Sequence, residues 1–111
     1  MAFNEALAER IRQGLAQRKN VEEKKMFGGV GFLLKGNMLV GVWKDSLIVR
    51  LGEEEGEEAL KEPHVKEFDI TGRPMRHWVL VGPEGVEDDE QLSAWIRRGV
   101  KFVGALPAKE K

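Results

Sequence analysis

The sequence predicts an α+β protein in which helices pack on one antiparallel sheet, with the elements in the order α-β-β-β-α-β-β-α. Near both ends of the chain, apolar residues recur at every third or fourth position, which is typical of amphipathic helices. Between residues 23 and 51 the period changes to two, which is typical of strands. The joins between the expected strands are as short as hairpin loops, which favours antiparallel neighbours.

The first helix is expected over residues 3–18. Asn4 is its expected N-cap, because the side-chain oxygen can accept an orphan amide of the first turn. The apolar stripe of this helix consists of Phe3, Leu7, Ile11 and Leu15.

A meander of three strands is expected next, over residues 32–35, 38–43 and 47–51. Gly36-Asn37 should form a two-residue turn of type I′ or II′, since glycine readily adopts the positive φ that such turns require. Residues 44–46 should join the second hairpin.

Both faces of the first hairpin are apolar. Pairing across Gly36-Asn37 places Phe32, Leu34, Leu39 and Trp43 on one face. The other face then carries Leu33, Met38, Val40 and Val42. A half-solvated antiparallel sheet should alternate apolar with polar residues. The second face should therefore meet the remaining helix or another subunit. We favour a homodimer, because large exposed apolar patches are uncommon on monomers.

The second half of the chain is expected to form a short helix, two strands and a last helix. Residues 52–62 carry six glutamates, five of them within 53–58, and predict a short acidic helix or turn, which Pro63 ends. Strands are expected over 65–70 and 77–81, joined by the loop 71–75. Asp88 and Gln91 have the spacing of a capping box that starts the last helix. The stripe expected to be buried on that helix is Leu92, Trp95, Ile96, Gly99, Val100 and Val103.

Composition favours a single cytoplasmic domain over residues 1–111. The chain has no cysteine, which excludes disulfides and thiolate chemistry. No secretory signal is recognisable at the start, and the longest apolar run, 38–43, is far shorter than the roughly 20 residues that span a bilayer. The 18 basic side chains are balanced by 19 acidic ones, which argues against a dedicated nucleic-acid-binding domain.

The glycine cluster at 28–31 is not a phosphate-binding loop. A dinucleotide fingerprint that starts at Gly29 would need glycine where Leu34 stands, and a helix where a strand is expected. A Walker loop counted from Gly31 would end in lysine and serine or threonine, but Asn37 and Met38 occupy those positions. Glycines that permit a bulge or a sharp bend at the entry to the sheet explain the cluster better.

The sequence contains few side chains that could act as catalytic nucleophiles. Its hydroxyl side chains are Ser46, Ser93 and Thr71, each at a position with an ordinary structural explanation. His64 and His77 lie in different segments and match no metal-binding spacing. We therefore predict no catalytic residues, no cofactor and no metal, and expect that the protein is not an enzyme.

The candidate interaction surface consists of Arg73, Pro74, Met75, Arg76 and Trp78. Arginine, methionine and tryptophan are enriched where protein surfaces meet. The alternative is an ordinary hairpin whose tryptophan enters the core. The pattern places the other two tryptophans, Trp43 and Trp95, in the core.

In several segments the chain resembles the TfoX N-terminal-domain family. These segments are 25–32, the hairpin 36–38, residues 72–75 with Trp78, and the helix start 88–95. The resemblance implies a two-layer α+β fold like that of type III secretion chaperones. The family's namesake, also called Sxy, regulates DNA-uptake competence in bacteria and carries a second, C-terminal domain. This chain ends at Lys111 and is expected to be a stand-alone member. The resemblance therefore does not imply that it shares the competence role of the namesake. The resemblance implies no catalytic residue or cofactor.

The sequence is compatible with three functions. The first is a protein-interaction or transcription-regulatory module. The second is a nucleic-acid-binding accessory domain, whose candidate residues are Lys24, Lys25, Arg73, Arg76, Arg97 and Lys101. The third is a small-ligand-binding domain or an enzyme.

Overall fold

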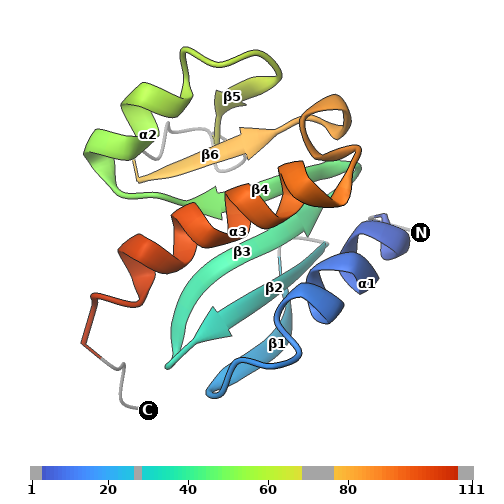
Figure 1. The fold of residues 1–111 in the computed structure, drawn as a ribbon, viewed down its shortest axis with the longest axis vertical. Helices are drawn as coiled ribbons and strands as arrows, with labels where there is room; N and C mark the ends of the chain where they lie inside the picture. The colour runs from blue at the N-terminus through green and yellow to red at the C-terminus, as the bar shows by residue number, and fades with distance from the viewer. Residues whose placement is uncertain (1–3, 27–28, 69–76, 108–111) are drawn as a thin grey trace.

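The computed structural model describes residues 4–26, 29–68 and 77–107, and it confirms the α+β class. Six strands form one antiparallel sheet in the order β1-β2-β3-β4-β6-β5. The two long helices, α1 and α3, lie on the same face of this sheet (Figure 1), which gives two layers. The elements are α1 Glu5–Gly14, β1 Val21–Met26, β2 Gly29–Leu34, β3 Asn37–Trp43, β4 Ser46–Arg50, α2 Glu53–Ala59, β5 Val65–Glu67, β6 Trp78–Val81, the 3₁₀ helix η1 Pro83–Val86 and α3 Asp89–Val103.

Strand β1 is an addition to the predicted order. Four of its six residues are charged, so no alternation of apolar residues marks it in the sequence. It forms the edge of the sheet and pairs along its whole length with β2. Pairing with a neighbour, rather than its own pattern, therefore makes this segment a strand.

The β2–β3 turn lies one residue earlier than predicted. Leu34 pairs with Asn37, so Lys35 and Gly36 are the two turn residues. Their φ values are 54° and 83°, as a type I′ turn requires.

A β-bulge follows this turn and changes which residues share a face. The register shifts between Phe32, which pairs with Val40, and Leu33, which pairs with Met38. Leu39 is the extra residue, and Leu39 and Val40 are both fully buried. The predicted faces are therefore wrong beyond the bulge. Trp43 lies on the opposite face from Val42 and is only half-buried, so its predicted place in the core is also wrong.

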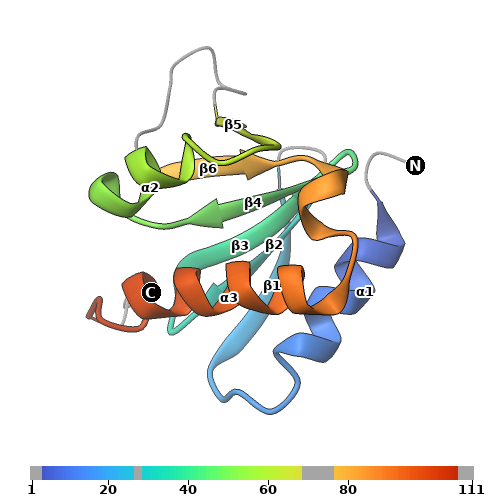
Figure 2. The same ribbon diagram turned by 45° about the horizontal axis from the view of Figure 1, so that its top comes forward.

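The core fills the space between α1, α3 and one face of the sheet. A side chain at Gly99 of α3 would contact Leu39 and Val49, which shows that α3 packs directly on β3 and β4. Cross-strand partners share a face, so the residues under the helices include Phe32, Val40, Val49 and Val79. Figure 2 shows no helix on the other side, which we call the helix-free face. Its members include Leu33, Met38, Trp43, Ile48, Trp78 and Leu80.

Asn4 is the N-cap of helix α1, as predicted, and the helix is shorter than the expected 3–18. The Asn4 side chain accepts a hydrogen bond from the Leu7 amide at 3.0 Å. The helix ends at Gly14 rather than at residue 18. Arg12 donates to both carboxylate oxygens of Glu23 on β1, at 2.8 and 2.7 Å, and also pairs with Glu9. These bonds hold the pKa of Glu23 below its usual value and join α1 to the edge strand.

The second half of the chain agrees closely with prediction. The acidic helix is α2, and β5 and β6 pair antiparallel. The last helix has both bonds of its capping box: Gln91 N to the Asp88 carboxylate at 2.8 Å, and Asp88 N to the Gln91 side chain at 3.1 Å. Its predicted stripe is buried, with Val100 half-buried. Residues 69 and 70 of the predicted strand 65–70 lie outside the described part of the chain.

Candidate functional site

Only one of the five predicted interaction residues can be located. Arg73, Pro74, Met75 and Arg76 lie outside the described residues. Trp78 is the first residue of β6, where it pairs with Arg50, the last residue of β4. It is half-buried on the helix-free face rather than enclosed in the core beneath the helices. Trp78 and the residues that contact it are therefore the candidate site.

Arg50 lies over two aromatic rings at this end of the sheet. Its guanidinium carbon is 5.4 Å from the centre of the Trp78 ring and 5.8 Å from that of Phe102, in the last turn of α3. Two further rings extend this group. The ring centre of Phe68 lies 6.0 Å from that of Trp78, and the His77 ring stacks on Phe102 with 6.3 Å between the ring centres. We call these five residues the Arg50 row. Such cation–π contacts stabilise a cation by about 0.5–2 kcal/mol.

Arg50 has no acceptor for its hydrogen-bond donors among the described residues. Its Nε has no exposed surface and no hydrogen-bond partner. The chain's two other half-buried described arginines both have acceptors. Arg10 donates to Val86 O, Glu87 O and Asp89, and Arg98 pairs with Glu62 at 2.9 Å. Leaving a buried donor unsatisfied costs about 1–3 kcal/mol, and nothing in the described part of the chain offsets this cost at Arg50.

Backbone contacts hold the Arg50 row in place. The carbonyl of His77 accepts hydrogen bonds from the amides of Leu51 at 2.8 Å and Gly52 at 3.1 Å. These bonds tie the end of β4 to the residue before β6. Sequence reasoning found Trp78 but missed Arg50 and Phe102. The available signal was a single arginine in the otherwise apolar run 47–51.

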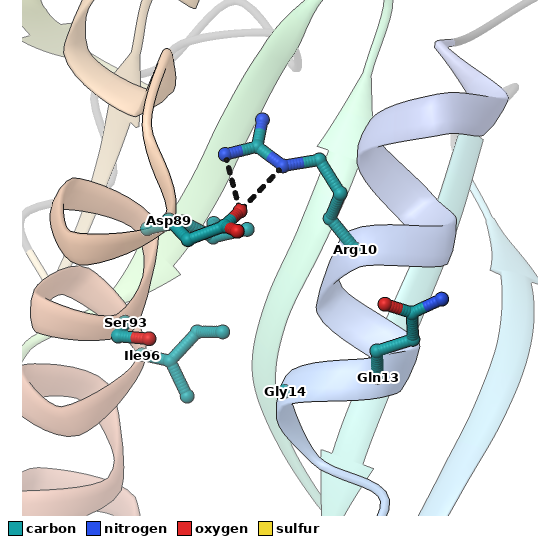
Figure 3. Close-up of a pocket in the computed structure, with 7 residues that line it drawn as sticks. Arg10, Gln13, Gly14, Asp89, Ser93 and Ile96 are labelled. Carbon is teal, nitrogen blue, oxygen red and sulfur yellow. Dashed lines mark hydrogen bonds and ion pairs between the residues drawn. The ribbon is translucent and has the colours of Figure 1, made fainter.

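A cleft of about 490 Å³ lies between α1 and α3. Figure 3 shows Arg10 reaching from α1 to Asp89 at the start of α3, with Ser93 and Ile96 facing the gap. Arg10 binds Asp89 Oδ1 at 3.2 Å and Val86 O at 2.9 Å, so it joins the two helices. Gly14 allows the close approach, since a side chain there would lie 3.3 Å from Ile96. The polar groups of this cleft therefore serve the packing of the helices.

A smaller cavity of about 260 Å³ lies beside α3 and includes His64, Trp95 and Arg98. His64 has a φ of 68°, in the left-handed region. Its carbonyl accepts a hydrogen bond from Gly82 N at 2.7 Å, which holds this conformation. Trp95 is buried as predicted and donates from Nε1 to Gly85 O at 3.2 Å. Arg98 lies over the Trp95 ring and pairs with Glu62, so the charge here is balanced within the fold.

The remaining predicted candidates are not brought together. Ser46 lies in β4, Ser93 in α3, and the two histidines at different ends of the sheet. Within residues 4–26, 29–68 and 77–107, no group of three or more acidic or histidine side chains is placed to hold a metal ion. Thr71 lies outside the described residues.

The glycine cluster acts through backbone contact. A Cβ at Gly29 would lie 2.0 Å from the carbonyl oxygen of Val42 on the neighbouring strand β3. Gly31 and Gly41 face each other across β2 and β3. The bulge itself lies further along, at Leu39 of β3. Gly28 is outside the described part.

Comparison with known proteins gives one match. The family model of the TfoX N-terminal domain matches residues 13–103. No curated protein and no solved structure matches this chain. In the described part of the chain, none of the helices combines the length and apolarity needed to span a membrane.

Proposed function

Because the chain belongs to the TfoX N-terminal domain family, we propose that it is a protein-interaction module that docks a partner on the Arg50 row. The observation that carries this proposal is the half-buried Arg50, which lies over Trp78 and Phe102 and lacks an acceptor among the described residues. Tryptophan and arginine in partly desolvated positions dominate the binding energy of many protein interfaces.

The relation to the competence regulator's domain favours a regulatory partner, such as a component of transcription. We propose that the protein acts by binding rather than by catalysis, and that it does so in the cytoplasm. The scarcity of nucleophilic side chains in the whole sequence supports the first part of this proposal.

Replacing Trp78 should abolish partner capture. We expect Trp78→Ala to recover a specific partner from the native cytosol at least about tenfold less well than the wild type, as for a hot-spot residue. Trp43→Ala is the matched control, because Trp43 is also a half-buried tryptophan on the helix-free face, beside Lys44. Circular dichroism must show that both variants are folded. Equal recovery by all three proteins would contradict the proposed site.

The arrangement of charges gives less support to the nucleic-acid alternative. Lys24 and Lys25 lie on the edge strand β1, and they point to opposite faces because they are consecutive. Arg97 and Lys101 are exposed one turn apart on α3. These four residues do not form one basic surface, and Arg73 and Arg76 lie outside the described part. Binding to single-stranded DNA with a steep salt dependence would favour this alternative.

We also propose that two copies associate through the helix-free face. Leu33, Met38 and Leu80 lie there half-buried, with no described helix covering them. Light scattering should then give twice the 12.5 kDa mass of one chain at high micromolar concentration. Met38→Glu should return it to the mass of one chain, because a charge would be buried at the interface. A wild-type protein that stays at 12.5 kDa would rule the dimer out.

A further inference from the structure

We propose that Arg50 is the receptor for a carboxylate group of the protein partner, bound against the rings of Trp78 and Phe102. The inference rests on the proposed function and deepens it, because it names the chemical group that the Arg50 row recognises. It depends on three properties of this residue: its unused donors, its aromatic surroundings and the charges nearby.

The donors of Arg50 are unused within the described part of the chain. A guanidinium has five N–H groups and no acceptor, and no hydrogen bond or ion pair within the described residues uses those of Arg50. Three glutamates follow at positions 53–55, close enough in sequence to provide an internal partner. Helix α2 begins there, and its Glu55 lies 4.0 Å from Arg98 on α3 instead. The described part of the fold therefore provides no acceptor for this cation.

The rings leave the donors of Arg50 free for a ligand. Trp78 and Phe102 attract the positive charge through their ring faces. A ring face does not replace a carboxylate or carbonyl oxygen as a hydrogen-bond acceptor, so the donors still require one. Arg50 is half-buried beside these rings, and a charge-assisted hydrogen bond is stronger where the group is partly removed from water.

The local charge favours a single carboxylate over a polyanion. Helix α2 carries five exposed glutamates, Glu53, Glu54, Glu55, Glu57 and Glu58, and it begins three residues after Arg50. A nucleic-acid backbone or a polyphosphate would bring many negative charges towards this helix. A peptide carboxylate brings one, and an apolar side chain next to it can pack on the aromatic rings. The best-fitting ligand is therefore a carboxylate beside an apolar residue.

Two small probes test the inference on the wild-type protein. N-acetylphenylalanine and its amide share one ring and differ in the charge of the terminal group. We expect the acid to bind at least about fivefold more tightly than the amide, and to shift the NMR signals of the Trp78 indole N–H and the Arg50 Nε–H. In Arg50→Lys this preference should disappear, because lysine keeps the charge but lacks the planar, two-pronged donor set.

Arg97→Gln is the matched control, because Arg97 is exposed on α3 and takes no part in the Arg50 row. It should keep the full preference for the acid. Equal binding of acid and amide by the wild type would overturn the inference, as would tighter binding of inorganic phosphate than of the acid. Partner capture that depends on Trp78, by a protein that does not distinguish the two probes, would leave the proposed function standing and remove only this inference.

Discussion

Gly29→Ala should unfold the domain or destabilise it by at least about 4 kcal/mol, a large share of the 5–15 kcal/mol that typically holds such a domain together. The added Cβ would lie 2.0 Å from the carbonyl oxygen of Val42 and 3.1 Å from its carbonyl carbon. Both atoms belong to the backbone of β3, so no side chain can rotate out of the way. The strands would have to separate at the start of β2, in the middle of the sheet.

Urea denaturation followed by circular dichroism measures this effect. Gly14→Ala is the control, because its Cβ would meet only the tip of Ile96, at 3.3 Å. Alanine also has a higher helix propensity than glycine by about 1 kcal/mol, which offsets a small steric cost. We expect this control to stay within about 1 kcal/mol of the wild type. A Gly29→Ala protein with wild-type stability would show that β2 and β3 do not approach as closely as described.

The predictable parts of the fold are those that a local sequence signal marks, and the Gly29 contact is not among them. Helices α1 and α3 were found because each has an apolar stripe and a recognisable N-cap. Strand β1 was not, because its charged residues carry no periodic signal and its pairing with β2 is a property of the sheet. A strand rather than a helix was expected to follow the glycine cluster, as β2 does, but only the structure shows which carbonyl excludes a side chain.

The largest errors came from one extra residue in β3. A bulge shifts the register by one, and in a strand such a shift moves every following side chain to the other face. Trp43 was predicted in the core for this reason, and it lies half-buried on the helix-free face. The position of the bulge depends on how two strands fit together, which a local pattern does not contain.

The candidate site was predicted only in part for a similar reason. Trp78 was singled out by composition, since tryptophan near arginines is typical of interfaces. Arg50 and Phe102 lie 28 and 24 positions away from Trp78 in the chain. They reach it because β4 pairs with β6 and because α3 ends beside Gly52. Contacts between residues so far apart follow from topology, which no motif in this sequence encodes.

Trp95→Ala should destabilise the protein by about 3–5 kcal/mol, as expected for the loss of a large buried aromatic side chain. Trp95 is 7% exposed and contributes to the core between α3 and the sheet. Its Nε1 donates to the carbonyl of Gly85 at 3.2 Å, which joins α3 to η1. The alanine variant would leave a cavity and an unsatisfied carbonyl, and Arg98 would lose the ring 4.4 Å from its guanidinium.

Trp95→Phe separates these contributions. Phenylalanine keeps most of the apolar burial but cannot donate to Gly85, so we expect a loss of about 1–2 kcal/mol. Denaturant midpoints of the three proteins measure the difference. The phenylalanine variant should still capture the partner, because Trp95 lies about two turns of α3 before Phe102 and does not contact the Arg50 row. If Trp95→Phe lost partner binding while remaining folded, the docking surface would extend to the Trp95 end of α3. The Arg50 row would then be only part of it.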